Sequence, residues 1–281
     1  MALDYPNLVP ENNLRLPDAL TIRHGPAALL SRFVLEADKV ARTAGIHLRL
    51  RNDFEVLAAL NEEQVARGNW YPLVNMFDPR RTDITPANGF WLSGENEQGE
   101  IVCTNAARIY YWPDTTLEEQ AVAMLYGRDE GQPCIITAEA AKTISGVVQC
   151  NGVTWVHPDC RGRGLSHVLP RVSRAYGLSR WPIDWVIAYV TMAHFQNGIA
   201  LGYGVRHFSS SVVYPETHFG ELVLAYTTSD EVCDDLDAYL SSELSDLSGA
   251  KFAPRSESTF LAQEVTKTSP EGVRHGSSRR S

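Results

Sequence analysis

The chain has 281 residues, of which 44% are hydrophobic, and it carries a formal net charge of −9 at pH 7. A chain of this length can bury one large core or two small ones, and we expect one large domain with extensions. The acidic balance argues against a general nucleic-acid surface, for which a basic footprint would be needed.

Cysteine usage and hydropathy point to the cytoplasm. The five cysteines are scattered, odd in number and without a C-x-x-C pair, as in proteins whose thiols stay reduced. No run approaches the ~18 apolar residues of a membrane span, and the start lacks the basic and apolar regions of a signal peptide. We therefore expect a cytoplasmic protein without nucleic-acid or membrane partners, and the scattered histidines predict no metal site.

The first part of the chain is predicted to be mostly helical. Residues 1–44 are predicted to form a proline-rich arm followed by an amphipathic helix over 26–44. Alternating polarity predicts a strand over 46–51. Apolar residues at helical spacing predict a second helix over 54–68, with Val56 on its apolar face.

A β-hairpin is predicted next. Its strands cover 89–95 and 100–112 and are joined by a polar, glycine-containing turn. Residues 113–146 are predicted to be an insertion that carries a helix over 116–126. The strand pattern resumes over 147–157.

Residues 158–166, Pro-Asp-Cys-Arg-Gly-Arg-Gly-Leu-Ser, are named here the anion-binding loop. A proline ends the preceding strand because it cannot donate to a ladder, and Gly162 and Gly164 allow the backbone to approach a ligand without a Cβ. The first turn of the following helix presents unsatisfied N–H groups and the positive end of the helix dipole. Since Arg161 and Arg163 add positive charge, the sequence predicts a site for a phosphate or pyrophosphate.

Other glycine-rich loops fit this segment less well. A P-loop would need Gly-Lys-Ser/Thr, which is absent, and the dinucleotide pattern G-x-G-x-x-G has His167 in place of its third glycine. A nucleophile elbow is matched by Gly164 and Ser166 but has Val168 in place of the closing glycine, which leaves serine chemistry as an alternative. The pattern R-x-x-G-x-[G/A] is met by Arg161 and Gly164, with Ser166 at its last position.

Helices and strands alternate after the loop. The patterns predict a helix over 164–176, an apolar strand over 185–191, a helix over 194–201 and a strand pair over 206–214 and 221–228. Acidic composition and apolar residues at helical spacing predict an acidic helix over 229–252. Its apolar stripe would dock on the domain, and an acidic partner-binding face is the alternative. Residues 253–281 are predicted to be disordered.

The anion-binding loop, preceded by Val156 and His157, resembles the acetyl-CoA pyrophosphate loop of the GCN5-related N-acetyltransferase (GNAT) superfamily. The order of predicted elements over 45–228 is similar to that of the superfamily. The resemblance implies an α+β protein with the acyl-CoA N-acyltransferase fold, a mixed and mostly antiparallel central sheet flanked by helices, here with an N-terminal helical extension and a C-terminal acidic helix. It also implies acetyl-CoA as a cosubstrate and transfer of the acetyl group to a primary amine of a small molecule, with a protein amine as the alternative acceptor.

The resemblance also implies which residues hold the cosubstrate. Backbone groups of Trp155, Val156 and His157 would pair with the pantetheine arm and polarise the thioester oxygen. The superfamily's helix asparagine falls near His194, and Asn197 lies one helical turn later on the same face, which makes Asn197 a cofactor contact. The pyrophosphate would be bound by Arg161, Gly162, Arg163, Gly164, Leu165 and Ser166.

The general acid and base are harder to assign. The superfamily's usual tyrosine position holds Ala200, and Tyr203, three residues on, is either the acid or a packed aromatic. His194 is the candidate base, because an unperturbed histidine has a pKa of about 6.5, although it could equally be a solvated or capping residue. The strand over 147–157 has no Asp or Glu, so a water relay stays open.

Aromatic residues predict where an acceptor would bind. Trp70, Tyr71 and Phe77 follow the second predicted helix, and residues 110–112 end the hairpin; they are either walls for an apolar or planar acceptor or ordinary core. Two other functions stay open: transfer of a longer acyl chain, including acyl-homoserine-lactone-like synthesis, and a catalytically silent CoA-binding sensor. A homodimer is also kept open.

Overall fold

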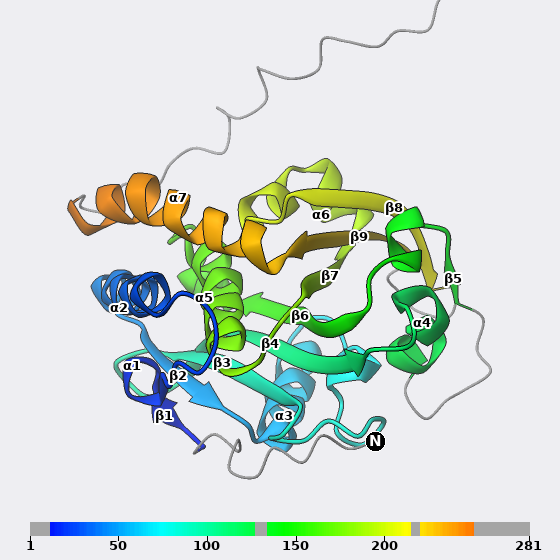
Figure 1. Ribbon diagram of the computed structural model, residues 1–281. Coiled ribbons are helices and arrows are strands. Elements are labelled where there is room, and N and C mark those ends of the chain that lie inside the picture. The colour runs from blue at the N-terminus through cyan, green and yellow to red at the C-terminus, as the bar shows by residue number, and fades with distance from the viewer. Residues whose placement is uncertain (1–11, 127–133, 215–219, 250–281) are drawn as a thin grey trace, which may run out of the picture.

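The computed structural model describes residues 12–126, 134–214 and 220–249. Within these residues the chain forms one mixed sheet of nine strands with helices on both faces (Figure 1). In spatial order the strands are β1 (Leu14–Arg15), β2 (His47–Arg51), β3 (Gly89–Glu95), β4 (Ile101–Trp112), β6 (Gly146–Val156), β7 (Trp185–Thr191), β9 (Gly220–Thr228), β8 (His207–Tyr214) and β5 (Ile135–Ile136). Among the described strands, only β6 and β7 pair in parallel. The expected α+β architecture is confirmed.

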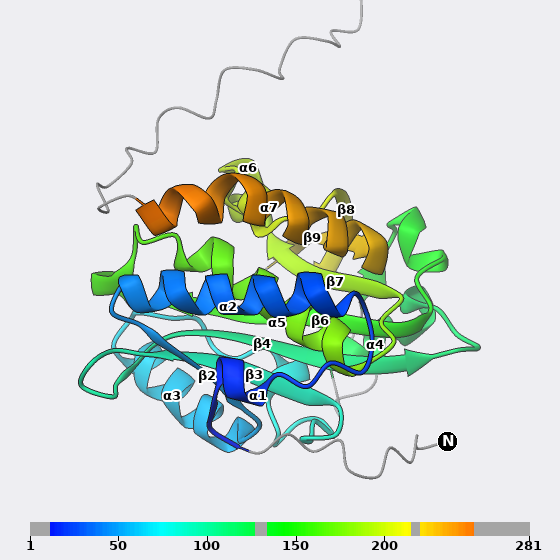
Figure 2. The same ribbon diagram turned by 60° about the vertical axis from the view of Figure 1, so that its left-hand side comes forward.

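Two helical layers cover the sheet, and each has its own core (Figures 1 and 2). The first core lies under α1 (Leu16–Ala19), α2 (Ala27–Thr43), α5 (Leu165–Arg180) and α7 (Ser229–Gly249). The second lies under α3 (Phe54–Ala66), the 3₁₀ turn η1 (Asn75–Phe77), α4 (Leu117–Tyr126) and the turn η2 (Glu139–Lys142). The sheet therefore has an α5 face and an α3 face, and these two names are used below.

Most predicted elements lie within a few residues of the observed ones, including the hairpin β3–β4, the strand β7 and the final pair β8–β9. Three predictions are wrong in detail. Val56 is exposed, because α3 buries Ala58 and Asn61 instead. The helix after the loop, α5, continues to Arg180, and the helix predicted over 194–201 is two short pieces.

The acidic helix was predicted to dock an apolar stripe, and α7 does so. Val232, Leu236, Tyr239 and Leu240 are buried in the core that α7 shares with α2 and α5, and the ring of Tyr239 lies 6.4 Å from that of Phe33. The segment predicted to be disordered, 253–281, lies outside the described residues. The short strands β1 and β5 and the short helix α1 were not predicted, because two to four residues carry no periodicity.

The parallel pair β6–β7 is the feature that positions a site. The two strands pair from Val148 with Trp185 to Asn151 with Ala188, and no pairing follows, although β6 runs on to Val156 and β7 to Thr191. The strands therefore separate in the middle of the sheet. We call the gap between 152–156 and 189–191 the slot.

Candidate functional site

The anion-binding loop joins the end of β6 to the start of α5. After the short turn η3 (Pro158–Cys160), Gly162 and Gly164 have φ values of +74° and +72°, and Gly164 is the residue that precedes the helix. This region of backbone conformation favours glycine. A Cβ on either glycine would meet open space, so the loop leaves room for a ligand beside its backbone.

The loop offers backbone donors. His167 and Val168 donate to the carbonyl of Gly164, whereas the amides of 162–166 have no acceptor among the described residues. Such amides at a helix start suit a phosphate group. The fit with a pyrophosphate therefore depends on the local backbone and on few side chains.

The two arginines of the loop differ from each other. Arg161 is exposed and donates from Nε to the carbonyl of Val156 at 3.2 Å, so its remaining nitrogens face solvent. Arg163 donates to the carbonyls of Ala44, at 3.1 Å, and Asp159, at 3.2 Å. The Arg163 guanidinium therefore ties the loop to the end of α2.

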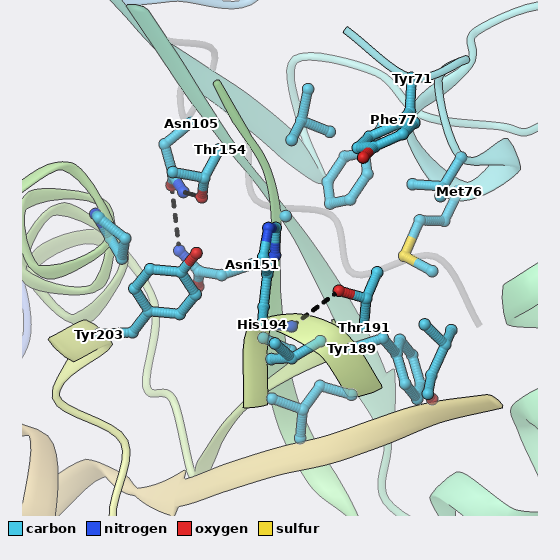
Figure 3. A pocket seen from close by; sticks show the side chains of 18 of the residues that line it. Tyr71, Met76, Phe77, Asn105, Asn151, Thr154, Tyr189, Thr191, His194 and Tyr203 are labelled. Atoms are coloured by element: carbon cyan, nitrogen blue, oxygen red, sulfur yellow. Dashed lines mark hydrogen bonds between the residues drawn. The ribbon is translucent and has the colours of Figure 1, made fainter. Parts of the chain in front are cut away.

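A cavity of about 190 Å³ opens where β6 and β7 separate (Figure 3). Its lining reaches both faces of the sheet. Asn105, Asn151, Arg174 and Tyr203 belong to the α5 side, whereas the α3 side supplies Trp70, Tyr71, Met76, Phe77, Leu125, Tyr189 and Leu222. The slot therefore connects the two layers.

A β-bulge shapes the β6 wall of this cavity. Thr104 pairs with Trp155 and Ala106 with Gly152, so the single residue Asn105 of β4 lies opposite both Val153 and Thr154. Val153 has a φ of +57°, which is rare for a β-branched residue and costs on the order of 1–3 kcal/mol. Its carbonyl accepts a hydrogen bond from the Thr104 hydroxyl at 2.8 Å. Strain of this kind concentrates at functional sites.

Sequence reasoning missed a cluster of amide side chains on the α5 side. Asn151 donates to the Ser173 hydroxyl at 2.8 Å and to Asn105 Oδ1 at 3.3 Å, and Asn105 donates to the Thr154 hydroxyl at 2.8 Å. Asn105 and Asn151 are both buried and both line the cavity. Polar side chains inside the otherwise apolar strand 147–157 were the signal that could have identified them.

His194 and Tyr203, the predicted base and acid, both line the cavity (Figure 3). His194 lies in the five-residue helix α6 (Met192–Gln196), which follows the end of β7, and its amide donates to the Thr191 hydroxyl at 3.3 Å. Burial lowers the pKa of His194 below 6.5 and raises that of Tyr203 above 10. At neutral pH the imidazole is therefore neutral and the phenol protonated, as a base and an acid require.

Tyr203 is held by two buried arginines of α5. Arg174 donates to the carbonyls of Tyr203, at 2.6 Å, and Gly204, at 3.0 Å, and Arg171 donates to that of Gly202 at 2.8 Å. Asp235 of α7 accepts from both guanidiniums, at 2.9 to 3.1 Å. Burial lowers the pKa of Arg174 to about 10, a shift that Asp235 opposes. The C-terminal helix thus supports the segment that carries the candidate acid.

Other predicted site residues lie elsewhere. Asn197 is an exposed C-cap of α6 outside the cavity lining, because Gly198 ends the helix there and α6 does not continue to 201. Ala200 is fully buried. Residues 110–112 do not line the cavity; the ring of Tyr110 stacks on that of Trp112 instead.

The three residues expected to contact pantetheine lie between the cavity and the anion-binding loop. Trp155 stacks on Trp70 with ring centroids 4.9 Å apart, and its indole donates to the carbonyl of Asn69. Val156 and His157 are half-buried. None of the three residues lines the cavity, and a contact with pantetheine would use their backbone.

The described residues hold neither a metal-binding cluster nor a membrane-spanning helix. No group of three or more His, Cys, Asp and Glu side chains in the ranges given above is arranged to hold a metal ion. Across those same ranges, no helix has the length and apolar character needed to cross a membrane.

Several solved structures are similar to this chain. No family model matches the sequence, and no curated protein matches it. An uncharacterized protein from Bacillus halodurans is 12% identical, with a TM-score of 0.44, over 70% of this chain and 92% of that one. A spermidine N-acetyltransferase from Vibrio cholerae, in complex with CoA and spermine, is 11% identical, with a TM-score of 0.38, over 66% and 97%. FeeM, an N-acyl amino acid synthase from uncultured soil microbes, is 11% identical, with a TM-score of 0.40, over 66% and 93%.

From β2 onward the chain runs through a strand, two helical pieces, a hairpin, a strand, the anion-binding loop with its helix, a parallel strand and a final strand pair. This is the order that the sequence predicted. It is also the order that the resemblance to the GNAT superfamily implies. The slot lies beside the helix that begins at the anion-binding loop.

Proposed function

We propose that the protein is an acyl-CoA-dependent N-acyltransferase that moves an acetyl group from acetyl-CoA to a primary amine of a small molecule. The observation that carries this proposal is the alignment of three features along one strand. The bulged half of β6 borders the slot, and its end leads into the amides of 162–166, which have no acceptor among the described residues. A molecule with a pyrophosphate at one end and a thioester at the other matches this arrangement.

The residues fit acetyl-CoA as a substrate. The amides of 162–166 and the free nitrogens of Arg161 would hold the pyrophosphate, with Arg163 fixing the loop. The backbone of 155–157 would pair with the pantetheine arm, and the bulge at Val153 would turn backbone donors toward the thioester oxygen. Main-chain groups held by a strand need no rearrangement as charge develops on that oxygen.

Proton transfer is assigned to His194 and Tyr203. The nitrogen of the amine attacks the thioester carbonyl carbon, a C–N bond forms and the C–S bond breaks. His194 accepts the proton that the amine loses, and Tyr203 donates a proton to the departing sulfur, so the products are an amide and a free thiol. Both pKa shifts keep the imidazole of His194 neutral and the phenol of Tyr203 protonated at neutral pH, which are the states that these roles need.

Release of free thiol from acetyl-CoA with a panel of primary amines tests the proposal. We expect amine-dependent thiol release, with the acylated amine detected by mass spectrometry. Acetyl-CoA that neither binds in calorimetry nor releases thiol with any amine contradicts the proposal. The chain's five free cysteines support a reducing compartment, and we propose the cytoplasm.

A catalytically silent CoA-binding module is the second candidate. It is favoured by Ala200, which occupies the position of the superfamily's usual acid and is fully buried. In that case acetyl-CoA binds in calorimetry, but no amine accelerates thiol release. The homodimer stays a prediction, which sedimentation would test.

A further inference from the structure

We infer that the acceptor is a monoamine with an apolar, uncharged body, such as an arylalkyl or alkyl amine, and that amines with a second positive charge are poor substrates. This inference rests on the proposed function and names the substrate class of the same cavity.

The α3 side of the cavity is apolar. Its wall combines the aromatic segment before and within η1 with Leu125 of α4, Tyr189 of β7 and Leu222 of β9. The Tyr189 hydroxyl is satisfied inside the wall, since it donates to the sulfur of Met124 at 3.7 Å. A wall of this kind gains free energy by covering carbon, and it offers few hydrogen-bonding groups to a polar acceptor.

The charges around the cavity are unfavourable for a polycation. None of the described residues that line it is Asp or Glu, and the one arginine among them, Arg174, is already bound to Asp235 and to two carbonyls. A second ammonium in this space would lose its hydration without gaining an opposite charge. The neutral state of His194 removes repulsion toward the single reacting amine.

The size of the cavity agrees with this class. A cavity of about 150 Å³ lined by aliphatic and aromatic residues is large enough to bind benzene, and the cavity at the slot measures about 190 Å³. The cavity therefore has the size of a small apolar group and not that of a long polyamine.

The position of the reacting nitrogen follows from the same lining. His194, Thr191 and Asn151 are at the slot, whereas Tyr71 and Met76 lie farther along the α3 side (Figure 3). An amine whose nitrogen reaches His194 therefore places its carbon chain or ring among the apolar residues of the α3 side. Tyr71 is 60% exposed, so it lies at the open end, where a substitution can change the charge of the entrance without burying a new charge.

The test compares hexylamine with 1,6-diaminohexane, two acceptors that differ by one positive charge at the far end. With acetyl-CoA as the donor we expect kcat/KM for hexylamine to be at least about tenfold higher, and 2-phenylethylamine to be a better acceptor than spermine. Tyr71→Glu should reduce the hexylamine preference, because it supplies a carboxylate at the entrance. Val56→Glu, on an exposed part of α3 outside the cavity, is the matched control and should leave the preference unchanged.

A size test uses Leu125→Phe, which adds carbon to the inner wall while keeping it apolar. It should raise KM for 2-phenylethylamine more than KM for methylamine. If no amine is turned over, calorimetric titration of hexylamine and of the diamine into the CoA complex tests the substrate class. Hexylamine should then bind more tightly than the diamine, by a similar factor.

The outcomes separate the two proposals. Failure of acetyl-CoA to bind or react overturns the proposed function. Equal or better use of the diamine or spermine, with acetyl-CoA turnover intact, overturns only the substrate class. A rate that rises from acetyl-CoA to octanoyl-CoA, with no preference among amines, assigns the cavity to the acyl chain and also overturns it.

Discussion

Gly164 combines two demands at one position. Its φ of +72° requires a residue that tolerates left-handed backbone, and its missing Cβ leaves space where the helix α5 begins. Gly99, in the turn between β3 and β4, has a similar φ of +80° and equally open surroundings but lies away from the anion-binding loop. The two glycines therefore form a matched pair for separating backbone strain from ligand binding.

We expect Gly164→Val to abolish acetyl-CoA binding in calorimetry, because a side chain would occupy the volume of the anion. Gly99→Val, which carries the same strain, should leave affinity unchanged.

Ser166→Ala should weaken acetyl-CoA binding by no more than about 1.5 kcal/mol, the value of one neutral hydrogen bond. Wild-type affinity in Gly164→Val would contradict the pyrophosphate site, and complete loss of activity in folded Ser166→Ala would point to serine chemistry.

His194→Ala should lower turnover by a factor on the order of 10² to 10⁴ with acetyl-CoA affinity nearly unchanged. Burial places the His194 pKa below 6.5, so wild-type turnover should stay high at pH 7 and fall as the pH drops through that pKa. This acidic limb should be absent from the variant. The exposed His47 of β2 provides a control, since His47→Ala should keep both the rate and its pH dependence. An acidic limb that persists in His194→Ala would assign proton transfer to another group.

At the scale of elements, α7 acts on the site through one carboxylate. Asp235→Asn weakens the hold on Arg171 and Arg174 and so on the carbonyls of 202–204, while leaving the α7 backbone in place. We expect lower turnover, unchanged acetyl-CoA affinity and a shifted basic limb of the pH profile, because the environment of Tyr203 changes. The neighbouring Asp234, which is exposed and pairs with Arg206, is the matched control. A variant of Asp235 that changes thermal stability alone would make its role purely structural.

Elements with strong local signals were predictable. The hairpin β3–β4, the strand β7 and the anion-binding loop follow from alternation, apolar runs and glycine placement, which are properties of neighbouring residues. The helix over 194–201 was wrong because Gly198 takes a φ of +74° and ends α6 after five residues. Helical spacing alone does not show where a glycine leaves the helix.

The cavity could be predicted only in part. His194 and Tyr203 were chosen by their distance from a motif, and the structure brings both to the cavity. Asn105 was missed because its neighbours Asn151 and Thr154 come from another strand, so the cluster exists only once β4 and β6 pair. Contacts between distant segments leave no periodic trace in the sequence.

At the scale of the whole molecule, the N-terminal and C-terminal helices share one core. Leu236 of α7 is fully buried there beside Phe33 and Val34 of α2, which are also buried. Leu236→Ala should lower the free energy of unfolding by about 2 to 5 kcal/mol, measured by denaturant titration. Leu35→Ala, at a position that is 56% exposed on α2, should change it little. A small loss for Leu236→Ala would mean that α7 is loosely held.

The slot also gives the sheet two edges in its interior. Sheets normally end at solvent, but the backbone of 152–156 and that of 189–191 face each other without pairing. An extended ligand with amide groups would act as a missing strand and join the two halves of the sheet into one ladder. Hydrogen exchange at 152–156 should then slow when acetyl-CoA is bound, whereas exchange in β3, already paired on both sides, should stay the same. The two halves of the sheet would then be hydrogen-bonded across the slot only while the substrate is bound.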